Sequence, residues 1–337
     1  MSKNFMKRRQ FLLTFGGALI GVPVIGSLIY DAIAKSKAQK QTSYEPATAQ
    51  SPIAKSSNIA DAKVNSDAEI TLETTEEPLL RFAAIADNGF GSPDQFAVAK
   101  SMWDTYQQKP YGFVLMAGDN IYSYGEIKLA KAYFEEPYAP LLKENVKFYA
   151  VLGNHDIIKS NNGLDQINYK PFNMRDRYYS FTKGEVNEGT VEFFAIDTNN
   201  NAPWDAQLTW LDQQLAKSTA PWKIVYGHHP LYSSGRHGSN PELAAKLAPI
   251  FAKHKVPLYL CGHDHGYERF NPIDGTTYIV NGGGGAPLYK FGRSPQTAFV
   301  SSQFSFMTFD VYQDKIITKA IATDGKVFDR SIITKTI

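Results

Sequence analysis

Clusters of acidic, amide, phenolic and imidazole side chains recur at five places along the chain, each directly after a short apolar run. They are Asp87-Asn88-Gly89, Gly118-Asp119-Asn120-Ile121-Tyr122, Gly153-Asn154-His155-Asp156, Gly227-His228-His229-Pro230 and Gly262-His263-Asp264-His265. Such a mixed set of oxygen and nitrogen donors suits iron, zinc or manganese and disfavours a thiolate-bound structural zinc. One carboxylate that bridges two cations allows a pair about 3.5 to 4 Å apart, which can clamp both oxygens of an in-line phosphoryl transfer. The residues therefore indicate a hydrolytic site with two metal ions.

The histidines support this interpretation. A lone histidine commonly satisfies a core or surface hydrogen bond and has no further role. Here, however, only His254 of the seven histidines lies away from the clusters. The other six lie within or just after them, namely His155, His228, His229, His237, His263 and His265. Chance does not account for clustering repeated so often with glycine beside each site.

The apolar runs before the clusters are predicted strands. They are Leu79 to Ala86, Phe113 to Ala117, Val146 to Leu152, Lys223 to Tyr226 and Val256 to Leu260. A sixth run, Val191 to Ile196, precedes Asp197, and a helix is predicted from Trp204 to Ala216. Ligands of open α/β sheets bind beyond the carboxyl ends of the strands, where these clusters stand. The pattern predicts an α/β fold.

The last part of the chain is predicted to be rich in strands. Four segments have strand character, Thr276 to Val280, Phe304 to Val311, Lys315 to Ile321 and Lys326 to Ile332. The run Gly282-Gly283-Gly284-Gly285 lacks the Lys-Ser/Thr of a phosphate-binding loop. We expect it to form a tight turn near the rim of the site.

Residues 1–34 have the features of an export signal. A basic segment, Lys7-Arg8-Arg9, leads into an uncharged run from Phe11 to Tyr30. Adjacent arginines followed by Phe-Leu resemble a twin-arginine signal, which an export machinery reads on folded proteins. We expect cleavage near Ala32-Ile33-Ala34 and a location in the periplasm or cell envelope, or secretion. The alternative is a retained membrane anchor, because 20 uncharged residues are long enough to span a bilayer.

Composition limits the rest of the chain. Residues 35–78 are poor in aromatic residues and are predicted to be a flexible linker, with one domain over residues 79–337. The chain has a net charge of +2, of which residues 1–34 carry +3, so the remainder gives no electrostatic case for binding nucleic acid. A single cysteine, Cys261, excludes an intramolecular disulfide.

In order along the chain, the five clusters resemble the five-block pattern of purple acid phosphatases, within the calcineurin-like metallophosphoesterases. The resemblance covers residues 79–337 in a compact form similar to the animal tartrate-resistant enzymes, and is particularly close over residues 259–265. It implies a four-layer αββα sandwich with two mixed sheets and an active site at the carboxyl ends of the strands.

Two positions separate this family from its relatives. Most metallophosphoesterases place a histidine two residues after the first aspartate, where this chain has Gly89. In purple acid phosphatases a tyrosinate at the position of Tyr122 binds ferric iron instead. A trivalent cation can hold a phenol deprotonated far below its free pKa of about 10. The resemblance therefore implies Fe3+ together with a divalent metal, Fe2+, Zn2+ or Mn2+.

The family's ligands carry over by position. The first ion would be bound by Asp87, Asp119, Tyr122 and His265. The second ion would be bound by Asp119, Asn154, His228 and His263. Asp119 would bridge the two ions.

Other positions lie on the substrate side of the family's site. His155 matches a residue that binds phosphate or handles a proton, and His237 matches one that protonates the leaving group. Arg236 stands where animal enzymes have an acidic residue, and it would either favour an anionic leaving group or be a solvated loop charge. For His229 we favour an orienting contact to a metal ligand over a contact to substrate.

The predicted function is hydrolysis of phosphate monoesters at acid pH. Metal-bound hydroxide would attack phosphorus in line, and His155 or His237 would protonate the departing alkoxide. The alternatives are a phosphodiesterase or nucleotide pyrophosphohydrolase on the same fold, with Mn, Zn or Ca, and an envelope protein that binds metal or phosphate without turnover.

Overall fold

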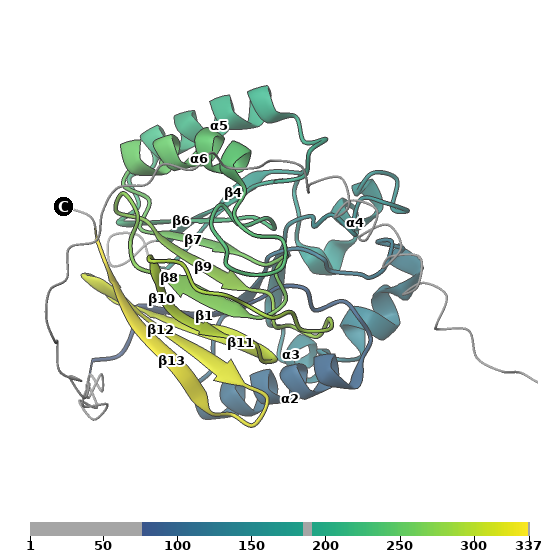
Figure 1. Cartoon of the computed structure of the whole chain (residues 1–337). Coiled ribbons are helices and arrows are strands. Elements are labelled where there is room, and N and C mark those ends of the chain that lie inside the picture. The colour runs from purple at the N-terminus through teal and green to yellow at the C-terminus, as the bar shows by residue number, and fades with distance from the viewer. Residues whose placement is uncertain (1–75, 185–190, 336–337) are drawn as a thin grey trace, which may run out of the picture. The chain divides into compact units, whose positions relative to one another are not determined.

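The computed structural model describes residues 76–184 and 191–335 (Figure 1). The predicted leader and the predicted linker up to residue 75 lie outside the described residues. Within the part that is described, no helix is both long enough and apolar enough to cross a membrane.

The first sheet has six strands in the order β13-β12-β11-β1-β2-β3. Its strands are β1 (Leu80–Ile85), β2 (Phe113–Met116), β3 (Lys147–Ala150), β11 (Ser305–Val311), β12 (Lys315–Ala322) and β13 (Val327–Thr334). The strands β1, β2 and β3 run parallel, with Ala84 opposite Leu115 and Leu115 opposite Tyr149. On the other side of β1, β11, β12 and β13 pair antiparallel. The carboxyl ends of β1, β2 and β3 therefore lie at one edge.

The second sheet has seven strands in the order β10-β8-β9-β7-β6-β5-β4. Its strands are β4 (Tyr179–Lys183), β5 (Val191–Ala195), β6 (Trp222–Tyr226), β7 (Leu258–Cys261), β8 (Tyr267–Phe270), β9 (Thr277–Asn281) and β10 (Thr297–Ser301). Its four central strands β5, β6, β7 and β9 are parallel. The outer strands β4, β8 and β10 are joined by antiparallel pairing.

Aromatic side chains fill the space between the two sheets. The fully buried ring of Phe82 on β1 stacks on Phe309 of β11 at a centroid distance of 4.5 Å. Its edge contacts Phe193 of the second sheet at 5.2 Å. Apolar burial of this kind is the main favourable contribution to folding, so this interface holds the sheets face to face.

Helices cover the outer faces of both sheets (Figure 1). The helices are α2 (Pro93–Gln108), α3 (Ala139–Lys143), α4 (Leu164–Ile167), α5 (Trp204–Lys217) and α6 (Pro241–Lys253), with the short turns η1 (Ile127–Leu129), η2 (Lys131–Glu135) and η3 (Lys170–Phe172). On α2, Ser101 donates a hydrogen bond of 2.9 Å to the carbonyl oxygen of Ala322 on β12. Leu211 of α5 and Phe251 of α6 pack in one apolar cluster with Val225 of β6. The expected α/β fold with two mixed sheets between helices is confirmed.

The predicted elements agree closely with the observed ones. Every predicted strand is present within two residues at each end, and the predicted helix from Trp204 is α5. The run Gly282–Gly285 lies beside the loop after β1, since the Gly284 N–H donates a 3.1 Å hydrogen bond to Ala86. The strands β4, β8 and β10 were not predicted.

Candidate metal centre

The predicted ligands stand in loops that leave the parallel strands of both sheets at one edge. Asp87 follows β1, Asp119 follows β2, and Asn154 follows β3. On the second sheet, His228 follows β6 and His263 follows β7. Backbone hydrogen bonds join neighbouring loops, from Asp87 to Gly118 at 3.0 Å and from Gly262 to His228 at 2.9 Å.

Three of these residues have a left-handed backbone. The φ angles are 55° at Asp87, 53° at Asp119 and 71° at His263. Each such conformation costs a non-glycine residue about 1–3 kcal/mol and persists only where its surroundings enforce it. Such strain gathers at functional sites, and here it turns side chains of both sheets toward one point.

The first predicted ligand set is brought together around Tyr122. The phenol oxygen lies 3.0 Å from Oδ1 of Asp87 and 3.1 Å from Nε2 of His265. One carboxylate oxygen each of Asp87 and Asp119 and a ring nitrogen of His265 lie within 4.8 Å of one another. The carbonyl oxygen of Pro287 can only accept, so Nδ1 of His265 donates to it and the Nε2 lone pair faces the oxygens.

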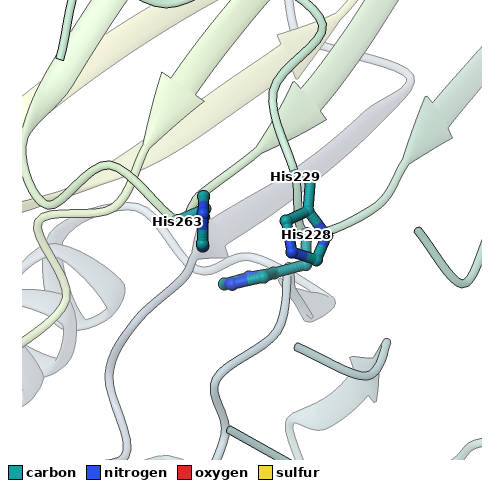
Figure 2. Close-up of side chains that lie close together, drawn as sticks. All are labelled: His228, His229 and His263. Atoms are coloured by element: carbon teal, nitrogen blue, oxygen red, sulfur yellow. The ribbon is translucent and has the colours of Figure 1, made fainter. Parts of the chain in front are cut away.

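The second predicted set meets around His228. Its Nε2 lies 3.1 Å from Oδ1 of Asn154 and 3.4 Å from Oδ2 of Asp119. Its Nδ1 donates to the carbonyl oxygen of Ala117, which again turns the Nε2 lone pair toward the oxygens. Ring nitrogens of His228, His229 and His263 lie within 4.8 Å of one another, and Figure 2 shows the three imidazoles gathered together.

The electrostatics of the site fit bound cations. Burial opposes a charged His228, but the neighbouring Asp119 carboxylate raises the pKa of His228 to about 10. Burial, followed by the charges of Asp119 and Asp87, raises the pKa of the Tyr122 phenol well above its ordinary value. The raised pKa values show that the carboxylates hold positive charge at this place, as a proton on His228. A metal cation would take the place of that proton and of the Tyr122 proton, so that an imidazole lone pair and a phenolate could bind it. The residues present therefore fit a metal pair.

Two further histidines flank the same point. Nδ1 of His155 donates a 2.7 Å hydrogen bond to the carbonyl oxygen of Ser123, and its Nε2 lies 4.0 Å from Oδ2 of Asp119. The exposed ring of His237 lies 4.1 Å from the ring of His263, between centroids. Both residues thus stand beside the candidate ligands.

Arg236 is attached to the same rim through an aromatic ring. Its guanidinium carbon lies 5.1 Å from the ring centroid of Tyr289. Tyr289 in turn stacks on His265, with centroids 4.1 Å apart. The Tyr289 ring therefore lies between the exposed guanidinium of Arg236 and the candidate ligand His265.

The comparisons with known proteins give the family. A family model described as calcineurin-like phosphoesterase matches residues 80–267. The chain belongs to this family. As a calcineurin-like phosphoesterase it is a hydrolase, and its curated relatives carry the names of acid phosphatases.

Tartrate-resistant acid phosphatase type 5 of Mus musculus is 30% identical over 248 residues, which cover 64% of this chain and 75% of the mouse protein. The solved structure titled "GAP50 the anchor in the inner membrane complex of Plasmodium" is 25% identical, with a TM-score of 0.70 over 77% of this chain and 89% of that one. Purple acid phosphatase PPD1 of Lupinus luteus has a TM-score of 0.63 at 19% identity over 76% of this chain and 53% of its own, and so supports the fold alone.

Two buried carboxylates of this phosphoesterase had no predicted role. Asp156 accepts hydrogen bonds from the backbone N–H groups of Asn120, Ile121 and Gly153 at 2.8 to 3.1 Å. It therefore joins the loops after β2 and β3 that carry Asp119 and Asn154. Burial, with the charge of Asp119, raises the pKa of Asp156 to about 6. Its place directly after Asn154-His155 in the sequence was the available signal.

Asp264 performs a similar task on the second sheet. It accepts a 2.6 Å hydrogen bond from the Ser233 hydroxyl and a 2.8 Å bond from the backbone N–H of His237. These bonds fix the loop that carries His237 beside His263. An acidic residue between two ligand-type histidines was its signal in the sequence.

His229, for which we favoured an orienting contact to a metal ligand, lies beside His228 and His263, and its role stays a prediction. In the part of the chain that is described, its ring hydrogen-bonds to the hydroxyl of Thr198 at 2.8 Å and to none of the seven predicted ligands. Burial, with the neighbouring His228, lowers the pKa of His229 to about 3, so its ring is neutral.

Proposed function

We propose that this chain is an acid phosphatase that hydrolyses phosphate monoesters at a centre of two metal ions. The observation that carries the proposal is the convergence of two donor groups that share Asp119. Asp87, Tyr122 and His265 lie on one side, and Asn154 and His228 on the other. His263 adjoins His228 through its ring, at a centroid distance of 5.1 Å.

The proposed ions are Fe3+, held by Asp87, Asp119, Tyr122 and His265, and a divalent ion, held by Asp119, Asn154, His228 and His263. When bound, the pair would act as Lewis acids on the phosphoryl group and activate water. Tyr122 supports iron, because a phenol at this site needs a strong cation to ionise.

The chain's own residues would bind the ester and move its proton. His155 stands beside Asp119 and His237 beside His263, so either could protonate the leaving oxygen. The hydrogen bond from His155 to Ser123 and the bonds of Asp264 to the His237 loop fix where those rings lie. Arg236 offers a positive charge at the same rim, to which an anionic part of the leaving group could bind.

The test compares nitrophenyl phosphate with bis(nitrophenyl) phosphate from acid to alkaline pH, with metal measured per chain. We expect iron in the protein and faster hydrolysis of the monoester below neutral pH. Faster hydrolysis of the diester, with manganese or zinc and no iron, would establish the phosphodiesterase alternative.

A second candidate is a protein without turnover, as the likeness to GAP50, described as the anchor in the inner membrane complex of Plasmodium, suggests. On that alternative the fold would bind metal or phosphate without turnover. It predicts retained metal and no release of phosphate from any monoester. The presence of both His155 and His237 favours the enzyme.

We also propose that the twin-arginine signal in residues 1–34 exports the protein to the periplasm or cell envelope. The support is the pair Arg8-Arg9 ahead of the uncharged run, in a segment outside the described residues.

A further inference from the structure

The hydroxyl of Thr198 has its full set of hydrogen bonds. It accepts from the backbone N–H of His228 at 3.2 Å and from that of His229 at 2.9 Å. A hydroxyl oxygen has two lone pairs and one hydrogen, so both lone pairs are used. Its hydrogen is left for the third partner, Nδ1 of His229, at 2.8 Å.

This arrangement fixes the tautomer of His229. Because Thr198 donates to Nδ1, that nitrogen must accept, and the single hydrogen of a neutral imidazole must stand on Nε2. His155 has the opposite arrangement, since its Nδ1 donates to the carbonyl oxygen of Ser123. In its neutral form His155 therefore presents a lone pair at Nε2, whereas His229 presents an N–H.

The His229 ring is also fixed in position at the metal centre. Its centroid lies 4.5 Å from that of His263 and 4.9 Å from that of His228. The backbone carbonyl oxygen of His229 accepts a 2.9 Å hydrogen bond from Tyr259. The His229 ring is only partly buried, and Nε2 is not among the described buried polar atoms that lack a partner. This N–H therefore keeps some exposure to solvent, beside the rings of His228 and His263.

We propose that Nε2–H of His229 donates a hydrogen bond to a phosphate oxygen of the bound ester, and that Thr198 holds His229 in the donor form. The proposal rests on the proposed function, because it assumes that a phosphate group binds beside His228 and His263. It assigns His229 to substrate and excludes it from the metal ligands, since a nitrogen that carries a hydrogen has no lone pair to give a cation.

The experiment measures binding of inorganic phosphate to the metal-loaded full chain by isothermal titration calorimetry, which needs no turnover. His229→Leu removes the donor, whereas His229→Gln places an amide N–H near the position of Nε2. We expect His229→Leu to weaken phosphate binding about tenfold to a hundredfold, as for a lost hydrogen bond to a charged group. His229→Gln should recover most of that loss, and both variants should keep the wild-type metal content.

Thr198 supplies a second, independent pair of variants. Thr198→Ser keeps the hydroxyl and should bind phosphate like the wild type, whereas Thr198→Val should weaken binding because Nδ1 is released. Nitrogen NMR of zinc-loaded, isotope-labelled protein should show the hydrogen of His229 on Nε2, and should show this preference lost in Thr198→Val.

Three results would overturn the proposal. Loss of metal in His229→Leu comparable to that in His228→Ala would make His229 a ligand. Unchanged phosphate affinity in His229→Leu would exclude the contact, and a hydrogen on Nδ1 would exclude the donor form. Failure of monoester hydrolysis alone would instead count against the proposed function, because phosphate binding and the tautomer are measured without it.

Discussion

The backbone N–H of Tyr122 donates a 2.7 Å hydrogen bond to the carbonyl oxygen of Gly89. This bond joins Gly89, where most metallophosphoesterases have a ligand histidine, to Tyr122, the residue proposed to replace it. A Cβ atom at Gly89 would lie 1.9 Å from the carbonyl oxygen of Asn120. The loop after β2 therefore approaches so closely that no side chain fits at position 89, and that same approach brings Tyr122 to the site.

Gly89→Ala should therefore disturb both the packing of the loop after β2 and the position of Tyr122. Because the obstacle is backbone and not a flexible side chain, we expect a loss of about 3 kcal/mol or more in unfolding free energy and a fall in bound iron. Thermal unfolding and metal analysis measure both. Gly112→Ala is the matched control, since the nearest atom to its added Cβ is 3.9 Å away. Equal stability of the two variants would contradict this account.

Tyr122→Phe tests the phenolate. Phenylalanine keeps the buried ring and removes only the oxygen, so we expect a folded protein that has lost the visible absorption of a ferric phenolate. Phe90, whose ring contacts Tyr122 at 5.4 Å, supplies Phe90→Leu as a control that keeps the oxygen. An unchanged visible spectrum in Tyr122→Phe would show that Tyr122 does not bind the iron.

Asp119 is shared by both donor groups, whereas His228 belongs to one. Asp119→Ala should lower the metal content more than His228→Ala does, because only Asp119 faces both groups. Equal metal loss in Asp119→Ala and His228→Ala would show that Asp119 does not bridge the two ions.

Removal of the metal should also destabilise the protein. Chelation of the wild-type protein should lower its Tm by about 5 to 10 °C, if the metal was present at about a hundred times its dissociation constant.

Arg236→Ala tests the charge at the rim. We expect KM for pyrophosphate to rise about two- to fivefold relative to that for nitrophenyl phosphate, which is the range for a solvent-exposed charge pair. Arg330→Ala, an exposed arginine on β13, serves as the control for the loss of one positive charge. If Arg236 is only a solvated loop charge, the two variants will show the same ratio.

The proposed twin-arginine export signal is tested at Arg8 and Arg9. Replacing both with lysine keeps the charge of the segment and should leave the protein in the cytoplasm, because the twin-arginine route reads the arginine pair. Cell fractionation followed by a phosphatase assay measures the outcome. Export of the doubly substituted protein at the wild-type rate would point to a different route.

The sequence allowed the strand ends and the donors on them to be predicted, because buried parallel strands are apolar runs and polar residues after them are conspicuous. Asp87 and His265 stand far apart in the chain, yet both follow such runs. By contrast, β8 was missed because it carries Glu268 and Arg269. Arg269 is half-buried and donates two hydrogen bonds of 2.7 and 2.9 Å to Asp329 of β13. A charged strand whose partner is distant in sequence has no local signature.

The same reason hid Thr198. Its hydroxyl matters only because the chain places it against His229, which lies 31 residues further on. No propensity or spacing rule gives that contact. The position of His237 likewise depends on a tertiary contact, because Asp264 accepts a hydrogen bond from Ser233 in the loop that carries His237.

The proposed ligands of each metal ion come from both sheets. Asp87, Asp119, Tyr122 and Asn154 come from the earlier half of the domain, and His228, His263 and His265 from the later half. Neither half offers a full set of donors for either ion, so a nascent chain would gain its affinity for metal only after both sheets had docked. Metal binding would then be the final step of maturation, and the bound ions would crosslink the two sheets. On the proposed twin-arginine route, which exports folded proteins, the metal ions would leave the cytoplasm inside the protein.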